Sequence, residues 1–203
     1  VMVTGTQESR LSGTKDPLFL LKDVENLLFL GEGDNYIGRY TEADEIGRNQ
    51  DRKYNGDGFS IHGARNVALK NLLIANNGND GACVSGHRKP SKSIWFEDCV
   101  FHRNTRQGVS IVSADGVYFK NCVFSDTCGL PPKCGLDIEP WLPTLNVTAN
   151  IYLLGCTFRN NRGGDLQFST SSLWPVTFYA KDCVFEPNMA GNLGITQRVL
   201  YPQ

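Results

Sequence analysis

The sequence predicts an all-β fold in which the chain winds into about six to seven coils of three short, parallel strands. Apolar residues alternate with polar ones over short stretches, as they do in half-buried strands. The segment from Gly108 to Phe124 (GVSIVSADGVYFKNCVF) contains three such stretches separated by turn residues. The same pattern recurs on both sides of that segment. A repeat of this kind is the signature of a solenoid.

The first strand of each coil is the most regular. Five of these strands begin at Gly58, Gly81, Gly108, Gly135 and Asp165. Alternation turns one apolar pair per strand inward and leaves three outward columns. The columns are Asp57, Asp80, Gln107 and Cys134 before each strand, then Ser60, Cys83, Ser110, Asp137 and Gln167, and last His62, Ser85, Val112, Glu139 and Ser169.

The third strand of each coil begins with an apolar residue after a residue that tolerates left-handed backbone geometry. These strands begin at Leu72, Cys99, Cys122, Cys156 and Cys183, in steps of 27, 23, 34 and 27 residues. The preceding residues are Asn71, Asp98, Asn121, Gly155 and Asp182. One connection therefore absorbs the insertions, and successive coils should stack their strands roughly 4.8 Å apart.

The remaining segments complete a single predicted domain over residues 1–203. We expect residues 1–13 to form an incomplete opening coil and Gly194-Ile195 to start one more first strand. No amphipathic helix precedes Leu18 to cover the end of the solenoid, so we expect the native chain to extend further upstream. The polar excursion from Asp34 to about Asn55 is expected to overhang the first-strand face as a binding or mobile loop.

The seven cysteines divide by position. Cys99, Cys122, Cys156 and Cys183 occupy one inward site and should pack as small apolar side chains. Cys128 and Cys134 bound a proline-stiffened connection, which favours a local disulfide. With a glycosylation sequon at Asn146, this indicates a secreted or cell-surface protein.

Charge and hydropathy exclude two classes of partner. A net charge of −1 and a pI of about 6.3 give no reason to expect nucleic-acid binding. No apolar run approaches the roughly 20 residues that a membrane-spanning helix needs.

The stretches NGDGFSIHGARNVALKNLLI, NDGACVSG and RQGVSIVS resemble the polygalacturonase branch of the pectate-lyase-like superfamily. This resemblance covers about Leu18 to Ile195 in layout and implies a right-handed parallel β-helix. In that family Asn-Thr-Asp-Gly, Asp-Asp and Gly-His-Gly begin three successive first strands. Asp57 matches the aspartate of the first motif, and Asp80 matches the second aspartate of the second.

The sequence departs from the polygalacturonase pattern at three points. Asn79 stands where the family has the other aspartate, Gln107 stands where it has histidine, and no Arg-Ile-Lys follows. The resemblance therefore implies either a different acid partner or different chemistry.

Four acids are the catalytic candidates. Asp57 and Asp80 should lie one coil apart, and glycoside hydrolysis uses carboxyl pairs roughly 5 to 9.5 Å apart. Asp137 and Glu139 both point outward from one strand, where their repulsion requires a cation, an arginine or a substrate. The alternatives are that Asp-Gly only turns the chain and that Asp137 and Glu139 form a solvated strand edge.

Six further residues are candidates for substrate binding, because cations, amides and aromatic rings recognise sugars and their acidic groups. These residues are His62, His87, Arg88, Arg106, Gln107 and Trp141. The sequence requires no cofactor, although the four acids could ligate calcium through oxygen. The metal assignment therefore stays open.

These observations favour a carbohydrate-active β-helix that cleaves glycosidic bonds of a polysaccharide by hydrolysis or β-elimination. The basic residues favour an acidic polysaccharide or oligosaccharide as the partner. The alternative is a non-catalytic glycan-binding or surface-attachment module that uses the same face.

Overall fold

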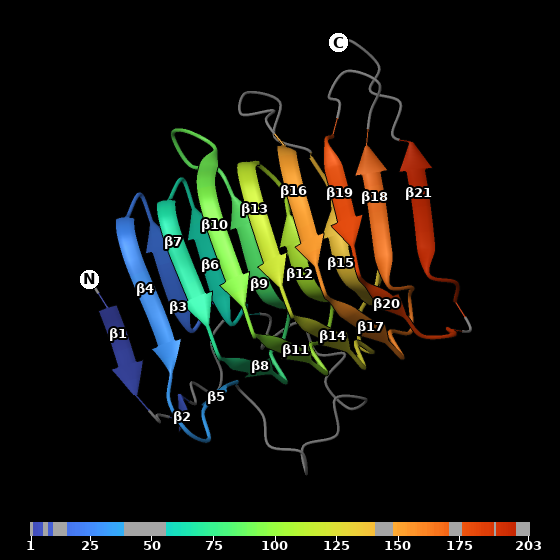
Figure 1. The fold of residues 1–203 in the computed structure, drawn as a ribbon, viewed down its shortest axis with the longest axis horizontal. Coiled ribbons are helices and arrows are strands. Elements are labelled where there is room, and N and C mark those ends of the chain that lie inside the picture. The colour runs from blue at the N-terminus through green and yellow to red at the C-terminus, as the bar shows by residue number, and fades with distance from the viewer. Residues whose placement is uncertain are drawn as a thin grey trace.

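The chain forms a right-handed parallel β-helix built from three sheets of seven strands each (Figure 1). The computed structural model describes residues 2–5, 8–9, 16–38, 56–140, 148–170, 176–188 and 190–197. Within these residues all paired strands are parallel, and no helix is long and apolar enough to cross a membrane. The predicted all-β solenoid of six to seven coils is confirmed.

Sheet C contains the predicted first strands. Its members are β3 (Phe19–Lys22), β6 (Phe59–His62), β9 (Asp80–Ser85), β12 (Gln107–Ile111), β15 (Cys134–Ile138), β18 (Leu166–Thr170) and β21 (Leu193–Gln197). The further first strand expected at Gly194-Ile195 is present as β21, which pairs with β18.

Sheet A holds the longest strands and faces the viewer in Figure 1. Its members are β1 (Met2–Gly5), β4 (Glu25–Gly31), β7 (Arg65–Lys70), β10 (Ser91–Glu97), β13 (Ala114–Lys120), β16 (Thr148–Leu154) and β19 (Phe178–Lys181). Strand β1 pairs with β4, as an incomplete opening coil should.

Sheet B holds the short third strands. Its members are β2 (Glu8–Ser9), β5 (Tyr36–Ile37), β8 (Leu73–Ala75), β11 (Val100–His102), β14 (Val123–Ser125), β17 (Thr157–Arg159) and β20 (Val184–Phe185). A sharp bend separates each of the last five from the sheet A strand before it. The residues predicted at these five bends all have positive φ, between 51° and 64°: Asn71, Asp98, Asn121, Gly155 and Asp182.

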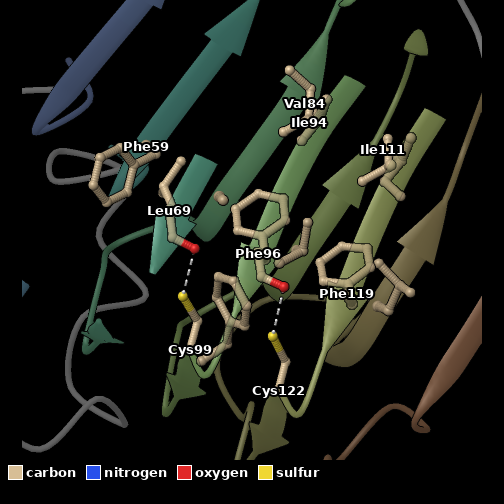
Figure 2. Packing of buried hydrophobic residues seen from close by; sticks show 14 of the residues in the cluster. Phe59, Leu69, Val84, Ile94, Phe96, Cys99, Ile111, Phe119 and Cys122 are labelled. Carbon is tan, nitrogen blue, oxygen red and sulfur yellow. Dashed lines mark hydrogen bonds between the residues drawn. The ribbon is translucent and has the colours of Figure 1, made fainter. Parts of the chain in front are cut away.

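The core runs along the inside of the solenoid as stacks of like side chains. Phe124 stacks between Phe101 and Phe158, with ring centroids 5.2 and 4.5 Å away. The predicted thiol stack is also present, with Cys99, Cys122 and Cys156 buried and Cys183 half-buried. Figure 2 shows Cys99 and Cys122 donating hydrogen bonds to the carbonyls of Leu69 and Phe96, at 3.3 and 3.4 Å.

The predicted disulfide between Cys128 and Cys134 is wrong, because both residues are free thiols. Cys134 is the first residue of β15, is buried, and lies in register with Gln107 of β12. The strand ladder therefore fixes its place, and no cross-link is needed to hold it.

Candidate active site

Register in sheet C confirms the outward columns that alternation predicted. Asp80, Gln107 and Cys134 are aligned on β9, β12 and β15. Cys83, Ser110 and Asp137 form the next column on the same strands. These side chains point away from the apolar core, yet Asp80, Ser110 and Asp137 are almost completely buried. The sheet therefore carries a buried polar layer on its outer face.

Arg106 joins two of the four candidate acids. One terminal guanidinium nitrogen lies 3.2 Å from Oδ2 of Asp80, and the other lies 3.1 Å from Oε1 of Glu139. The same nitrogen that contacts Asp80 also donates to Oε1 of Gln107 at 2.7 Å. Because one planar group makes both contacts, the two contacting carboxylate oxygens lie at most about 9 Å apart.

Asp80 and Asp137 receive further hydrogen bonds from residues of β12. Ser110 donates its hydroxyl to Oδ2 of Asp80 at 2.7 Å. Gln107 donates its amide to Oδ2 of Asp137. Gln107 thus links the guanidinium of Arg106 to Asp137, and the network extends across three coils.

Asp57 closes the network at the coil before Asp80. It accepts hydrogen bonds from the Ser60 hydroxyl at 2.6 Å, from the Asn79 amide at 2.8 Å and from the backbone N–H of Asp80 at 3.3 Å. These donors hold Asp57 beside the start of β9. The Asp57-Gly58 pair therefore does more than turn the chain, since the Asp57 carboxylate also holds the neighbouring residues in place.

The arrangement shifts the proton affinity of Asp80. Burial, followed by the nearby charge of Asp57, raises the pKa of Asp80 well above its ordinary value, against the opposing effects of Arg106 and Ser110. Burial opposes the charge of Arg106, but the carboxylates of Asp80 and Glu139 raise its pKa overall. Asp80 is therefore suited to hold a proton beside a permanent cation.

A hollow of about 360 Å³ opens over this cluster. The residues that line it are Asn79, Asp80, Cys83, Arg106, Ser110, Val112 and Glu139. Burial and the nearby Asp57 raise the pKa of the Cys83 thiol, which keeps it protonated. Cys83 is therefore a wall of the hollow and a poor nucleophile.

The two candidate histidines lie apart from the Arg106 network. His62 ends β6 and is half-buried, and burial lowers its pKa while Asp57 opposes this shift only in part. His87 contacts Oδ2 of Asp23 at 2.8 Å on the turn after β9. Arg88 is exposed on the same turn and does not line the hollow.

Two sequence predictions lie outside the described residues, namely the stacking role of Trp141 and the glycosylation of Asn146. Most of the polar excursion, residues 39–55, lies outside them as well. In the part of the chain that is described, no three His, Cys, Asp or Glu side chains are grouped so as to hold a metal ion. The cation between Asp80 and Glu139 is instead the guanidinium of Arg106.

Sequence reasoning selected Asp80, Glu139, Arg106 and Gln107 correctly as neighbours, but it missed Ser110 and Cys83 as parts of the hollow. Their signal was present, because both occupy the same outward column as Asp137. Ser110, for example, is in register with Asp137 and donates its hydroxyl to Asp80 of the preceding coil. A small polar residue in an outward column is therefore a candidate hydrogen-bond donor to an acid on a neighbouring coil.

Two known proteins are similar to parts of this chain. A protein of Bacillus subtilis (strain 168), described as "SPbeta prophage-derived uncharacterized protein YorA", is 26% identical over 172 residues, which cover 75% of this chain. The chain spans only 28% of that relative's length. A solved tailspike protein, gp49 of Acinetobacter baumannii bacteriophage Fri1, is described as a capsular polysaccharide depolymerase. It aligns at 14% identity with a TM-score of 0.38 over 86% of this chain and 45% of its own.

The family model for the right handed beta helix region matches residues 39–198. That match covers most of the sequence and includes strands β6 to β21 of all three sheets. The fold implied by the resemblance to pectate-lyase-like proteins is thereby confirmed, and the chain belongs to the right-handed β-helix family.

Proposed function

We propose that the protein cleaves glycosidic bonds of a polysaccharide bound over sheet C, with Asp80 as the acid and Glu139 as the base. The observation that carries this proposal is the guanidinium of Arg106, which holds both carboxyl groups on the wall of one hollow. The two contacting oxygens lie no more than about 9 Å apart, which is below the upper end of the roughly 5 to 9.5 Å over which paired carboxyls act in glycoside hydrolysis.

The two carboxyls differ in the way that the reaction requires. The Asp80 side chain is 2% exposed, and its raised pKa favours the protonated form, whereas the Glu139 side chain is 10% exposed at the mouth of the hollow. Asp80 gives its proton to the glycosidic oxygen as the bond from that oxygen to the anomeric carbon breaks. Glu139 takes a proton from a water molecule whose oxygen bonds to the same carbon. Asp57 supports the acid, because its charge helps to raise the pKa of Asp80.

The charges around the hollow favour a sugar without an acidic group at the point of cleavage. Among the described residues around the hollow, the acids Asp57, Asp137 and Glu139 outnumber the one cation, Arg106, even when Asp80 is protonated. An anionic sugar would be repelled by this excess. The cations that favoured an acidic substrate in the sequence do not offset it, since His87 contacts Asp23 and Arg88 lies off the hollow. Hydrolysis of a bond at a neutral sugar therefore fits better than β-elimination, which needs a uronate.

A non-catalytic glycan-binding module is the second candidate. Deep burial of Asp80 and its contacts with Arg106 and Ser110 favour it, because these contacts must loosen before the acid can reach a glycosidic oxygen. Extracellular action is part of both proposals.

The test is the release of reducing ends from a panel of neutral and acidic polysaccharides. Asp80→Asn and Glu139→Gln should each abolish release while glycan retention remains. Asp182→Asn, which alters an exposed acid at a bend after sheet A and away from both carboxyls, should behave as the unchanged protein. Retention without products from any polysaccharide supports the binding module. Products that absorb in the near ultraviolet contain an unsaturated uronate, and would overturn hydrolysis in favour of elimination.

A further inference from the structure

A single row of aromatic side chains crosses the outer face of sheet A, away from the sheet C hollow. Trp95, Tyr118, Tyr152 and Tyr179 are in register on β10, β13, β16 and β19 (Figure 1 shows these strands side by side). Trp95 stacks on Tyr118 with ring centroids 3.9 Å apart, and Tyr118 stacks on Tyr152 at 5.1 Å. We call these four residues the aromatic row.

Each ring of the row packs against its neighbour, but among the described residues no ring packs against the other face of Trp95, at the end of the row. The position next to Trp95 on β7 is Ala68, whose methyl group is too small to cover an indole. Tyr118 covers one face of Trp95, yet 41% of this residue remains exposed. The flat face of Trp95 therefore adjoins a lower step over Ala68, about one strand spacing wide, which Leu28 of β4 borders on its other side.

Charged residues border this step on both sides. Lys70 and Lys120 each form an ion pair with Glu97, so donors and acceptors alternate along one edge of the row. On the other edge lies a hollow of about 290 Å³. It is lined by Arg65, Lys89, Pro90, Ser91, Lys92 and Asp115.

The hollow on sheet A is basic, unlike the one on sheet C. Three cations and one acid line it. Because Lys92 pairs with Asp115 at 3.3 Å and Lys89 pairs with Glu25 at 3.0 Å, the excess positive charge is that of Arg65. Lys92 precedes Trp95 by three residues on β10, a separation of at most roughly 10 Å, because the positive φ of Ser93 bends the strand between them. A ligand of a few rings would reach both places.

We propose that this surface is a binding site for an acidic glycan, with one pyranose ring stacked on Trp95 above Ala68 and an acidic substituent in the basic hollow. Sugar rings stack on aromatic faces through their apolar side, and their hydroxyls suit a border of alternating lysine and glutamate. Arginine and lysine complement a carboxylate or sulfate.

A protein partner fits this surface poorly. The apolar strip is one residue wide, whereas a stable protein interface buries about 800 Å² on each side. A protein would also have to cover the ion pairs around Glu97. A glycan covers a narrow strip and can leave its outer edge in water.

The decisive experiment fills the step without disturbing the fold. Ala68→Tyr places a ring where the sugar would lie, extending the aromatic row by one member, so the protein should stay folded and lose binding. Affinity electrophoresis in gels that contain polygalacturonate, hyaluronate or dextran measures the retention. The unchanged protein should be retained by an acidic probe more than by dextran. Ala68→Tyr and Trp95→Ala should each weaken that retention about tenfold.

Matched variants separate this site from the proposed active site. Lys92→Gln should reduce retention by the acidic probes alone, and Tyr179→Ala, at the far end of the row, should leave it unchanged. Glu139→Gln alters only the sheet C hollow and should retain the glycan fully, so the two proposals can fail independently. The proposal is overturned if none of the probes retains the unchanged protein. It is also overturned if the Ala68→Tyr variant melts at the same temperature as the unchanged protein and is retained as strongly.

Discussion

Replacing Arg106 by methionine removes the cation between Asp80 and Glu139 while keeping an unbranched side chain. Asp80 would then lose its guanidinium contact at a position where only 2% of the side chain is exposed. Removing one partner of a buried ion pair costs about 3 to 5 kcal/mol, but Arg106 is itself 28% exposed, so we expect a loss of about 2 to 3 kcal/mol at pH 8.

The loss should depend on pH with a definite sign. The pKa of Asp80 in the folded protein is raised, so the folded state binds this proton more tightly than the unfolded chain does. Stability therefore falls as the pH rises from the ordinary carboxyl value through the raised one. Arg106 opposes this shift, and its removal should widen the interval over which stability is lost. Arg106→Met should thus be more damaging at pH 8 than at pH 5.

Urea unfolding at the two pH values measures this difference, with Arg106→Met combined with Asp80→Asn as the control. The added substitution removes the buried negative charge, so the double variant should be more stable at pH 8 than Arg106→Met alone. An equal loss at pH 5 and pH 8, or a double variant no better than the single one, would refute the reasoning that a buried carboxylate is what Arg106 stabilises.

Two further predictions concern the coils themselves. Phe124→Ala removes a fully buried ring stacked between Phe101 and Phe158, and should lower the free energy of unfolding by about 3 to 5 kcal/mol, whereas a loss below about 1 kcal/mol would contradict close packing along the stack. Asn121 has φ of 51°, so Asn121→Ala should be about 1 kcal/mol less stable than Asn121→Gly in thermal or urea unfolding, and the reverse order would contradict the left-handed bend.

The repeat made the fold predictable, because the same local requirement returns in every coil. Each bend needs a residue that accepts positive φ, and the asparagines, aspartates and glycine of the sequence mark those places. Alternation then fixed which side chains of sheet C face outward. The predicted disulfide failed because closeness in sequence does not determine which side chains meet. Cys134 is instead buried in the ladder of sheet C, in register with Gln107.

The candidate site was only partly predictable. Strand register determines the positions of the Cα and Cβ atoms, but it does not determine where the terminal atoms of long side chains lie. Asp80 and Glu139 were selected separately, but their link depends on how far Arg106 extends across neighbouring coils. Spacing in the sequence does not specify that reach. The same limit applies to His87, which was expected at the substrate face and instead contacts Asp23, a residue 64 positions away in sequence.

The most direct test of the account is the titration of Asp80 followed by carboxyl carbon NMR. We predict that Asp80 titrates well above the ordinary value of 3.8, and that Asp57→Asn moves the titration to lower pH because a nearby negative charge is removed. A titration of Asp80 at or below 3.8 in the unchanged protein would contradict the buried acid on which the proposed chemistry depends.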